Sequence, residues 1–274
     1  VQHHHAHVAS VMAEHGVTDR VIGFAFDGTG YGTDGTIWGG EVLVADYDGF
    51  ERVAHLAPVA LPGGDAAVRD PGRMALSHLR SAGIPWDEDL PPVADHPEIA
   101  REALAVQFER DINTIPTTSM GRLFDAASAL AGVRQTSNYE AQAAIEFEAV
   151  VDLTEGRSYE FALRETETPI ILEPAPVLAG IVDDVRAAVP VGLIAARFHV
   201  AVATMIVQVA ERIRARTGIT TVGLSGGVFQ NVTLTHAAAT ALGEKGFAVL
   251  IHRLVPPNDG GLALGQAVIA AKRR

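Results

Sequence analysis

The chain lacks cysteine entirely, so none of its 274 residues can form a disulfide, a thiolate metal site or a thiol nucleophile. Positive charge is scarce as well: 21 lysine and arginine residues face 33 aspartate and glutamate residues, and the formal net charge is −12. A surface of this sign repels phosphate backbones, so we do not expect a nucleic-acid partner. A metal ion would need histidine and carboxylate ligands, and a phosphate group would need a local binding site.

Long apolar runs without polar interruption are also missing. The most apolar stretch, at about residues 198–210, contains His199 and Gln208, and we expect it to be too polar and too short for a membrane span. No leader sequence is recognisable, so we expect a cytoplasmic protein without a membrane partner. The opening Val-Gln-His-His-His-Ala-His is already in helical register, which indicates that Val1 lies inside a longer protein. The hydrophobic content of 48% is enough for a substantial core.

The order of predicted elements indicates an α/β fold. Turn residues and periodicity predict a helix that ends near residues 15–16, and then strands at 21–26, 36–45 and 51–58. Helical spacing follows over 70–151, with a proline-rich break at 85–97 and a helix at about 119–132, before short strands at 159–163 and 170–172. The last third predicts a helix at 191–216, a strand at 220–224, a helix at 229–244, a strand at 247–251 and a helix at 259–272.

Strands that alternate with helices imply a parallel part of the sheet that is covered by helices. Together with the opening meander, this order predicts a mixed sheet flanked by helices, as in the ribonuclease-H-like lobe of actin-like ATPases. The helical stretch would then be an insertion at about residues 66–155.

Two histidines and two aspartates are candidate metal ligands. His3 and His7 are four residues apart on one predicted helix, so both imidazoles project from the same face. A tag remnant or a chance cluster on a solvated helix remains open, although a tag would not continue into an amphipathic helix. Asp27 follows the first strand and Asp259 precedes the last helix, where an ordinary turn residue and an N-cap are the alternatives. Such a set of ligands suits Fe(II), Zn or Mn, with open positions for a phosphate or carbonyl oxygen.

Two glycine-rich segments are candidates for binding phosphate. Residues 28–35 lack the lysine of a Walker loop and lead into another strand, which predicts a flexible strand-to-strand turn. Residues 225–231, Ser-Gly-Gly-Val-Phe-Gln-Asn, follow a predicted strand and open a predicted helix. Free N–H groups and the positive end of the helix dipole would favour an anion there, but an ordinary tight turn explains the pattern about as well.

Weaker candidates for phosphate or substrate contacts are Arg69, Arg73, Arg122 and Glu140. An arginine more often pairs with a surface carboxylate, and a glutamate at helical spacing usually lies on a solvated face. Isolated histidines such as His199 and His252 are expected to be packing or surface residues.

Six short motifs follow one another along the chain. They are Val-Gln-His-His-His-Ala-His at 1–7, Asp-Gly-Thr-Gly at 27–30 with Trp-Gly-Gly-Glu at 38–41, Leu-Pro-Gly-Gly-Asp at 61–65, Gly-Arg-Leu-Phe-Asp-Ala at 121–126, Gly-Leu-Ser-Gly-Gly-Val-Phe-Gln-Asn at 223–231 and Asn-Asp-Gly-Gly at 258–261. In this order they resemble the HypF family of carbamoyltransferases in hydrogenase maturation. A looser similarity extends to antibiotic O-carbamoyltransferases and to the tRNA threonylcarbamoyl transferase.

The resemblance implies one lobe of a two-lobed domain that binds ATP or carbamoyl adenylate, the latter made from carbamoyl phosphate and ATP. It also implies one divalent ion, Fe, Zn or Mn, with Mg as a further candidate beside nucleotide. The carbamoyl group would pass to the C-terminal cysteine of a HypE-like acceptor protein. Residues 20–274 would form the second lobe, and residues 1–19 a helix that belongs to, or bridges from, an upstream lobe. Without the upstream domains the chain could be inactive.

The resemblance also assigns the site residues. By position, the metal ligands and catalytic residues would be His3, His7, Asp27 and Asp259. The nucleotide-binding residues would be Gly28, Thr29, Gly30, Ser225, Gly226, Gly227 and Asn231. Two alternatives stay open: an O-carbamoyl or tRNA threonylcarbamoyl transferase of the same fold, and a non-catalytic module that binds nucleotide to regulate assembly.

Overall fold

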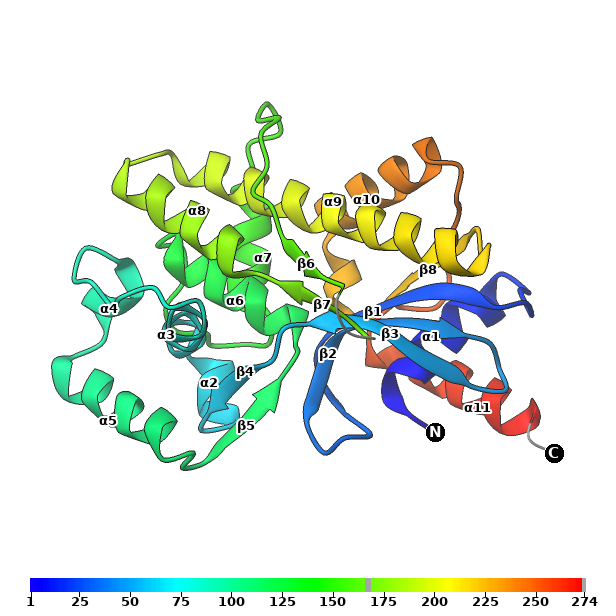
Figure 1. Ribbon diagram of the computed structural model, residues 1–274, viewed down its shortest axis with the longest axis horizontal. Coiled ribbons are helices and arrows are strands. Elements are labelled where there is room, and N and C mark those ends of the chain that lie inside the picture. The colour runs from blue at the N-terminus through cyan, green and yellow to red at the C-terminus, as the bar shows by residue number, and fades with distance from the viewer. Residues whose placement is uncertain (166–168, 273–274) are drawn as a thin grey trace.

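One mixed β-sheet organises the helices of the molecule (Figure 1). The computed structural model describes residues 1–165 and 169–272. Among these residues the strands are β1 (Val21–Tyr31), β2 (Ile37–Ala45), β3 (Phe50–Leu56), β4 (Val59–Pro62), β5 (Thr114–Thr117), β6 (Ala162–Arg164), β7 (Ile170–Glu173), β8 (Thr221–Ser225) and β9 (Ala248–Ile251). Their order is β6-β7-β3-β2-β1-β8-β9, and β4 and β5 lie off this path, where β5 pairs with both β2 and β4.

Strand direction divides the sheet into two parts. β1, β2 and β3 form an antiparallel meander, in which Phe24 of β1 lies opposite Val42 of β2. β1, β8 and β9 are parallel, and Phe24 also lies beside Leu224 of β8. Parallel neighbours need a crossover connection, which helix α10 (Val232–Glu244) supplies between β8 and β9. The predicted mixed α/β sheet flanked by helices is therefore confirmed.

Alternation along β1 sends its side chains into two cores. Ile22 and Phe24 join the larger core, to which α6 (Met120–Leu130) and α9 (Val191–Thr217) contribute. Val21 and Ala25 join the smaller core beneath α1 (His3–Glu14), and α11 (Leu262–Lys272) packs against α1. Because successive residues of a strand point to opposite faces, β1 carries both layers of helices.

Between β4 and β6 the chain forms mainly helices. That residues 66–155 are an insertion into the lobe stays a prediction. The further helices of this region are α2 (Asp65–Arg69), α3 (Pro71–Ser81), α4 (Pro91–Asp95), α5 (Glu98–Glu109) and α7 (Gln142–Ala149). The prediction of helical spacing over 70–151, broken only at 85–97, is wrong at β5, which pairs antiparallel with β4. Both strands are short and contain a proline, so they lack the usual sequence signal of a strand.

Other boundaries also differ from the prediction. β1 continues to Tyr31, so Gly28, Thr29 and Gly30 lie in a strand and not in a flexible turn. Strand β6 begins at 162 instead of 159, and helix α8 (Ala175–Arg186) was not predicted. Short 3₁₀ turns precede α10 and α11, so these helices begin at 232 and 262 instead of 229 and 259.

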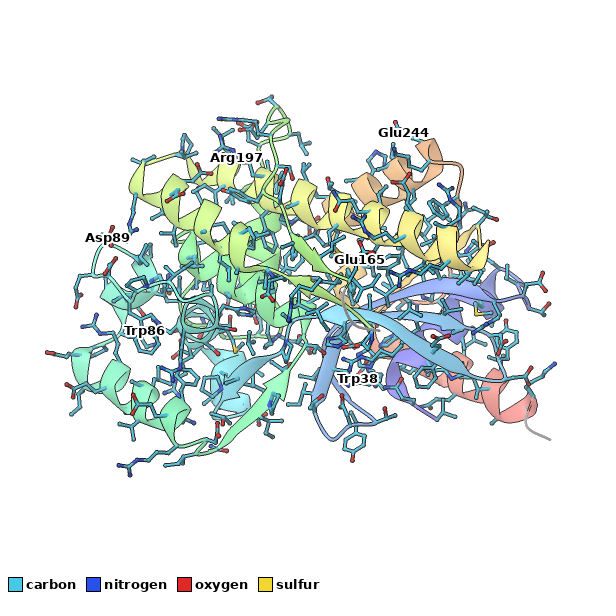
Figure 2. All side chains as sticks on the ribbon, in the orientation of Figure 1. Trp38, Trp86, Asp89, Glu165, Arg197 and Glu244 are labelled. Carbon is cyan, nitrogen blue, oxygen red and sulfur yellow. The ribbon has the colours of Figure 1, made fainter. Side chains whose placement is uncertain are left out.

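Helix α9 is long and apolar enough, by length and composition alone, to cross a membrane. The expectation that this stretch is too polar and too short for a span is therefore wrong by both measures. However, 78% of its apolar 18-residue window is buried inside the protein. Its Arg197 (Figure 2) is buried and donates hydrogen bonds to Glu155 and Asp184. A core helix whose buried charge is paired accounts for both the apolar composition of α9 and the burial of Arg197.

The crossing of α1 and α11 requires a glycine. A Cβ atom at Gly265 of α11 would overlap the carbonyl oxygen of Ala6 on α1. We predict that Gly265→Ala lowers the free energy of unfolding by about 1–3 kcal/mol, because the two helices must separate. Gly243→Ala on α10 is the matched control, since a Cβ there would meet no atom within 4 Å among the described residues beyond its own helix turn. Urea denaturation checks both variants, and equal stability of the two would contradict the close crossing.

Candidate metal centre and adjoining cavity

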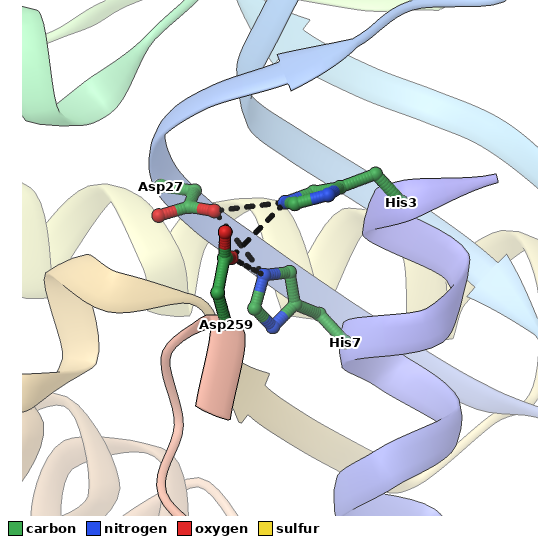
Figure 3. A group of neighbouring side chains, drawn as sticks. All are labelled: His3, His7, Asp27 and Asp259. Atoms are coloured by element: carbon green, nitrogen blue, oxygen red, sulfur yellow. Dashed lines mark hydrogen bonds and ion pairs between the residues drawn. The ribbon is translucent and has the colours of Figure 1, made fainter. Parts of the chain in front are cut away.

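Four side chains from three separate parts of the chain meet at one point (Figure 3). His3 and His7 come from α1, Asp27 from β1, and Asp259 from the 3₁₀ turn Asp259–Gly261. One potential ligand atom from each lies within 4.8 Å of those from all the others. The sequence predicted these four residues as a set, and the structure brings them together.

Asp27 Oδ2 is the centre of the cluster. It lies 3.1 Å from the Nε2 atoms of both His3 and His7. Asp259 Oδ1 is slightly farther, at 3.5 Å from His3 Nε2 and 3.4 Å from His7 Nε2. Two imidazole nitrogens and two carboxylate oxygens that face one another are a donor set that fits a divalent ion of the Fe, Zn or Mn type.

Backbone N–H groups orient the second oxygen of Asp27. Its Oδ1 atom accepts hydrogen bonds from Gly28 N at 2.9 Å and from Gly227 N at 3.2 Å. These two N–H groups therefore bind Asp27. The sequence had suggested that N–H groups of the turn at 225–231 are free to bind an anion, but the N–H group of Gly227 is not. Outer hydrogen bonds of this kind hold a metal-ligating carboxylate in place.

Local structure explains why the histidines face inward. The Gln2 side chain caps α1 by accepting from His5 N. The register of β1 against β2 shifts between Phe26 and Gly30, and a side chain at Gly30 would collide with the rings of His3 and His4. Gly30 therefore makes room for α1 and does not itself line the cavity described below.

Burial and pairing set the charges of the cluster. Burial raises the pKa of Asp27, but the hydrogen bonds with His3 and His7 outweigh it and hold that pKa well below its usual range. Burial lowers the pKa of His7, but its hydrogen bonds with Asp259 and Asp27 outweigh burial and raise it. The side chain of His7 is 1% exposed and that of Asp259 is 69% exposed, so the cluster opens to solvent on the Asp259 side.

A cavity of about 730 Å³ adjoins the cluster, and Asp27 and Asp259 line it. Gly28, Thr29 and Gly227 also line it. This volume lies within the range of small-molecule sites, about 300–1,000 Å³. Apolar lining residues are Val68, Phe124, Ala144, Ile145 and Val228. The cavity thus combines an apolar wall with the polar cluster at one end.

Asn231 lines the cavity as well, but its side chain already has two partners. Its Oδ1 accepts from Leu234 N and caps α10, and its Nδ2 lies 2.8 Å from His199 Nε2. Ser225 and Gly226 do not line the cavity. Ser225 is fully buried, and a Cβ at Gly226 would overlap the backbone of Phe26. Direct side-chain contact between Ser225 and a nucleotide is therefore not supported by its placement.

The three candidate arginines differ in whether they line the cavity. Arg122 is buried and lines the cavity, and its Nε and Nη1 atoms have no hydrogen-bond partner among the described residues. Arg69 and Arg73 do not line the cavity, and Arg73 pairs with Asp70 at 3.3 Å. The expectation that these two arginines contact substrate is not supported, whereas Glu140 does line the cavity.

Sequence reasoning missed Asp125 and Glu148, which also line the cavity. Asp125 Oδ2 lies 3.1 Å from Arg122 Nη2, and both side chains are almost fully buried. The motif Gly-Arg-Leu-Phe-Asp-Ala contained this pair, and the three-residue spacing on a helix was the signal that could have found it. Glu148 Oε1 accepts from Thr233 N near the start of α10.

The fold and the motif order define a known class of domain. Residues 23–266 match the family described as "Carbamoyltransferase, Kae1-like Domain, second subdomain", and the chain belongs to this family. The predicted actin-like fold class is confirmed by this match and by the solved structures described next.

Its relatives carry the name HypF. The chain is 40% identical over 271 residues to carbamoyltransferase HypF of Rhizobium leguminosarum bv. viciae, which covers 98% of this chain and 34% of that protein. It is 38% identical over 283 residues to a carbamoyltransferase HypF homolog of Cupriavidus necator, covering 100% of this chain and 71% of that protein. The chain therefore spans about a third of the Rhizobium relative.

Two solved structures share the fold. The crystal structure of full-length HypF in its phosphate- and nucleotide-bound form matches with a TM-score of 0.93 and 42% identity, over 99% of this chain and 42% of that chain. HypF of T. kodakarensis matches with a TM-score of 0.83 and 32% identity, over 98% of this chain and 36% of that chain.

Burial of Asp125 generates a testable pH dependence. Burial raises the pKa of Asp125 to about 6, against the opposing charge of Arg122. An acid with a raised pKa stabilises the fold only while it is protonated, so its contribution is full below about 3.8 and lost as the pH rises through about 6. We predict that the unsubstituted chain loses stability relative to Asp125→Asn as the pH rises from about 3.8 to about 6, measured as the free energy of unfolding. Urea unfolding at several pH values measures it, and a difference that stays constant or rises would be the contrary result.

Proposed function

We propose that this chain is the metal- and nucleotide-binding lobe of a HypF-type carbamoyltransferase. In the whole protein, carbamoyl phosphate and ATP would give carbamoyl adenylate, and the carbamoyl group would pass to the C-terminal cysteine of a HypE-like acceptor in hydrogenase maturation. We place this reaction in the cytoplasm. The observation that carries the proposal is the convergence of His3, His7, Asp27 and Asp259 at the end of a cavity of about 730 Å³.

The four clustered side chains would hold one divalent ion. Their nitrogen and oxygen donors fit Fe, Zn or Mn, and Mg²⁺ could accompany a nucleotide in the same cavity. When bound, such an ion polarises a carbonyl or phosphate oxygen and stabilises negative charge that develops on it. The buried, ionised Asp27 supplies the fixed negative charge, and its hydrogen bonds from Gly28 and Gly227 keep Oδ2 directed at the histidines.

The cavity wall supports a nucleotide or adenylate as the ligand. Arg122 lines the cavity, and a guanidinium group there suits a phosphate oxygen. Its Nη2 atom pairs with Asp125, whereas its buried Nε and Nη1 atoms have no hydrogen-bond partner among the described residues, which is costly in the absence of a ligand. The apolar residues Phe124, Ile145 and Val228 could cover a base. One relative of the same fold was crystallised with phosphate and nucleotide bound, which agrees with this assignment.

Steps outside this lobe would belong to other parts of the protein and to its partner. These 274 residues contain no cysteine, so the acceptor thiol would lie outside this lobe, and we assign it to the HypE-like acceptor. The chain spans about a third of the Rhizobium relative, and formation of the adenylate is assigned to the remainder.

Removal of one candidate ligand tests the metal centre. We predict that Asp259→Asn lowers the affinity for Zn²⁺ by about a hundredfold or more, since loss of a ligand costs at least as much as loss of an outer partner. The Asp259 side chain is 69% exposed, so folding should be preserved. Asp19→Asn, at another exposed aspartate, is the control. Isothermal titration calorimetry measures both variants, and equal affinities would refute the assignment of Asp259.

A pair of arginine variants tests the cavity. We predict that Arg122→Leu weakens binding of ATP at least about tenfold, because a hydrogen bond to a charged group contributes about 1.5–3 kcal/mol. Arg73→Leu should bind ATP like the unsubstituted chain, since Arg73 does not line the cavity. Equilibrium binding of a fluorescent ATP analogue measures both. Equal losses in the two variants would contradict the proposed site.

The transfer reaction is tested on the full-length parent protein with ATP, carbamoyl phosphate and a candidate acceptor. Mass spectrometry should detect a carbamoyl group on the terminal cysteine of the acceptor. Its absence, with the metal and nucleotide bound, would leave the binding assignments standing and remove the proposed activity.

A further inference from the structure

A buried chain of hydrogen bonds links Ser225, His252 and Glu14, which are not members of the metal cluster. Ser225 Oγ is 2.9 Å from His252 Nε2, and His252 Nδ1 is 3.1 Å from Glu14 Oε2. Ser225 is fully buried, and the side chains of His252 and Glu14 are 3% and 6% exposed. None of the three residues lines the cavity. His252 was expected to be an isolated packing or surface residue, but it links two distant segments.

The direction of these hydrogen bonds follows from the carboxylate. Burial raises the pKa of Glu14, but hydrogen bonds from Leu254 N and Arg253 N outweigh it and lower that pKa, so the group is ionised and only accepts. His252 Nδ1 must therefore donate to Glu14. Burial lowers the pKa of His252, so its ring is neutral and Nε2 accepts from the Ser225 hydroxyl.

Glu14 also holds the segment that leads to Asp259. Its Oε1 accepts from Arg253 N at 2.7 Å and Leu254 N at 2.8 Å, and its Oε2 accepts from Val255 N at 3.3 Å. Glu14 is the last residue of α1, the helix that carries His3 and His7. One carboxylate thus ties the histidine helix to the loop that ends at the Asp259 turn.

Ser225 connects the same network to Asp27. Ser225 is the last residue of β8. The next residue, Gly226, donates its N–H group to Pro257 O at 2.9 Å. Gly227 N then donates to Asp27 Oδ1 at 3.2 Å. The network therefore reaches helix α1, the loop that leads to Asp259, and the turn after β8, whose Gly227 N–H group binds Asp27 on β1.

We infer that Glu14, His252 and Ser225 are positioning residues that hold the two histidines and the two aspartates of the cluster in register. This inference rests on the proposed metal-binding function. The residues touch neither the cavity nor the cluster directly, and they act through the segments that they join. Rigid outer hydrogen bonds of this type reduce the reorganisation needed when ligands close around an ion.

The arrangement has the order of a serine, histidine and acid triad, but burial excludes that role. A nucleophilic hydroxyl must reach substrate, whereas Ser225 has no exposed surface and does not line the cavity. Positioning requires only that the hydrogen bonds persist.

Zinc affinity of matched variants tests the inference. Ser225→Ala and Glu14→Ala should lower the affinity of the chain for Zn²⁺ by about ten- to a hundredfold. Glu14→Gln should restore most of it, because its amide oxygen can accept from Arg253 N and Leu254 N and its NH₂ can donate to a reversed His252 tautomer, so that only the longer bond from Val255 N is lost. Tyr159→Phe, which removes a partly buried hydroxyl that donates to Asp184, is the control for general destabilisation. Competition with a chromophoric chelator measures affinity, and urea unfolding measures stability.

Three results would overturn the positioning role. One is Zn²⁺ affinity in folded Ser225→Ala equal to that of the unsubstituted chain. Another is an equal loss of affinity in Tyr159→Phe. The third is covalent labelling of Ser225 by a fluorophosphonate, which would show an accessible nucleophile.

A second measurement separates this inference from the proposed function. In ¹⁵N-histidine spectra without metal, the resonances of His3 and His7 should shift in Ser225→Ala and stay unchanged in Tyr159→Phe. Failure of the unsubstituted chain to bind any Zn²⁺ would remove the metal assignment alone. Unchanged His3 and His7 resonances in Ser225→Ala would remove the positioning role.

Discussion

The shared carboxylate of Asp27 is the interaction on which the rest of the site depends. A buried charge is costly unless it is paired and hydrogen-bonded, and both conditions are met here. One oxygen takes N–H groups from Gly28 and Gly227, and the other faces His3 and His7. Since these partners come from β1, the turn after β8, and α1, satisfying one carboxylate fixes how the sheet, the turn and the first helix meet.

Several motif glycines are explained by the close packing around this carboxylate. A side chain at Gly39 would approach Asp27 O to 2.6 Å, and one at Gly121 would approach Gly28 Cα to 2.9 Å. Gly30 leaves room for the imidazoles in the same way. These glycines of the short motifs therefore allow the close packing at the site, and of the three only Gly121 also lines the cavity.

Much of this architecture could be predicted from sequence, because the apolar run at 21–26 with its flanking turn residues and the helical spacing of His3 and His7 are local signals. The approach of Asp259 depends on the topology of β8, β9 and the final turn, and here the family resemblance supplied what periodicity could not. The burial of Arg122 was not anticipated, since burial of a cation cannot be read from one sequence. Strands β4 and β5 were missed because each is four residues long with a proline.

The most direct test of the account is anomalous diffraction from a crystal of the chain soaked in Zn²⁺. The account predicts one strong peak about 2.0–2.2 Å from the Nε2 atoms of His3 and His7 and from carboxylate oxygens of Asp27 and Asp259. A map with no peak at this point, or with Zn²⁺ bound only at other residues, would contradict it.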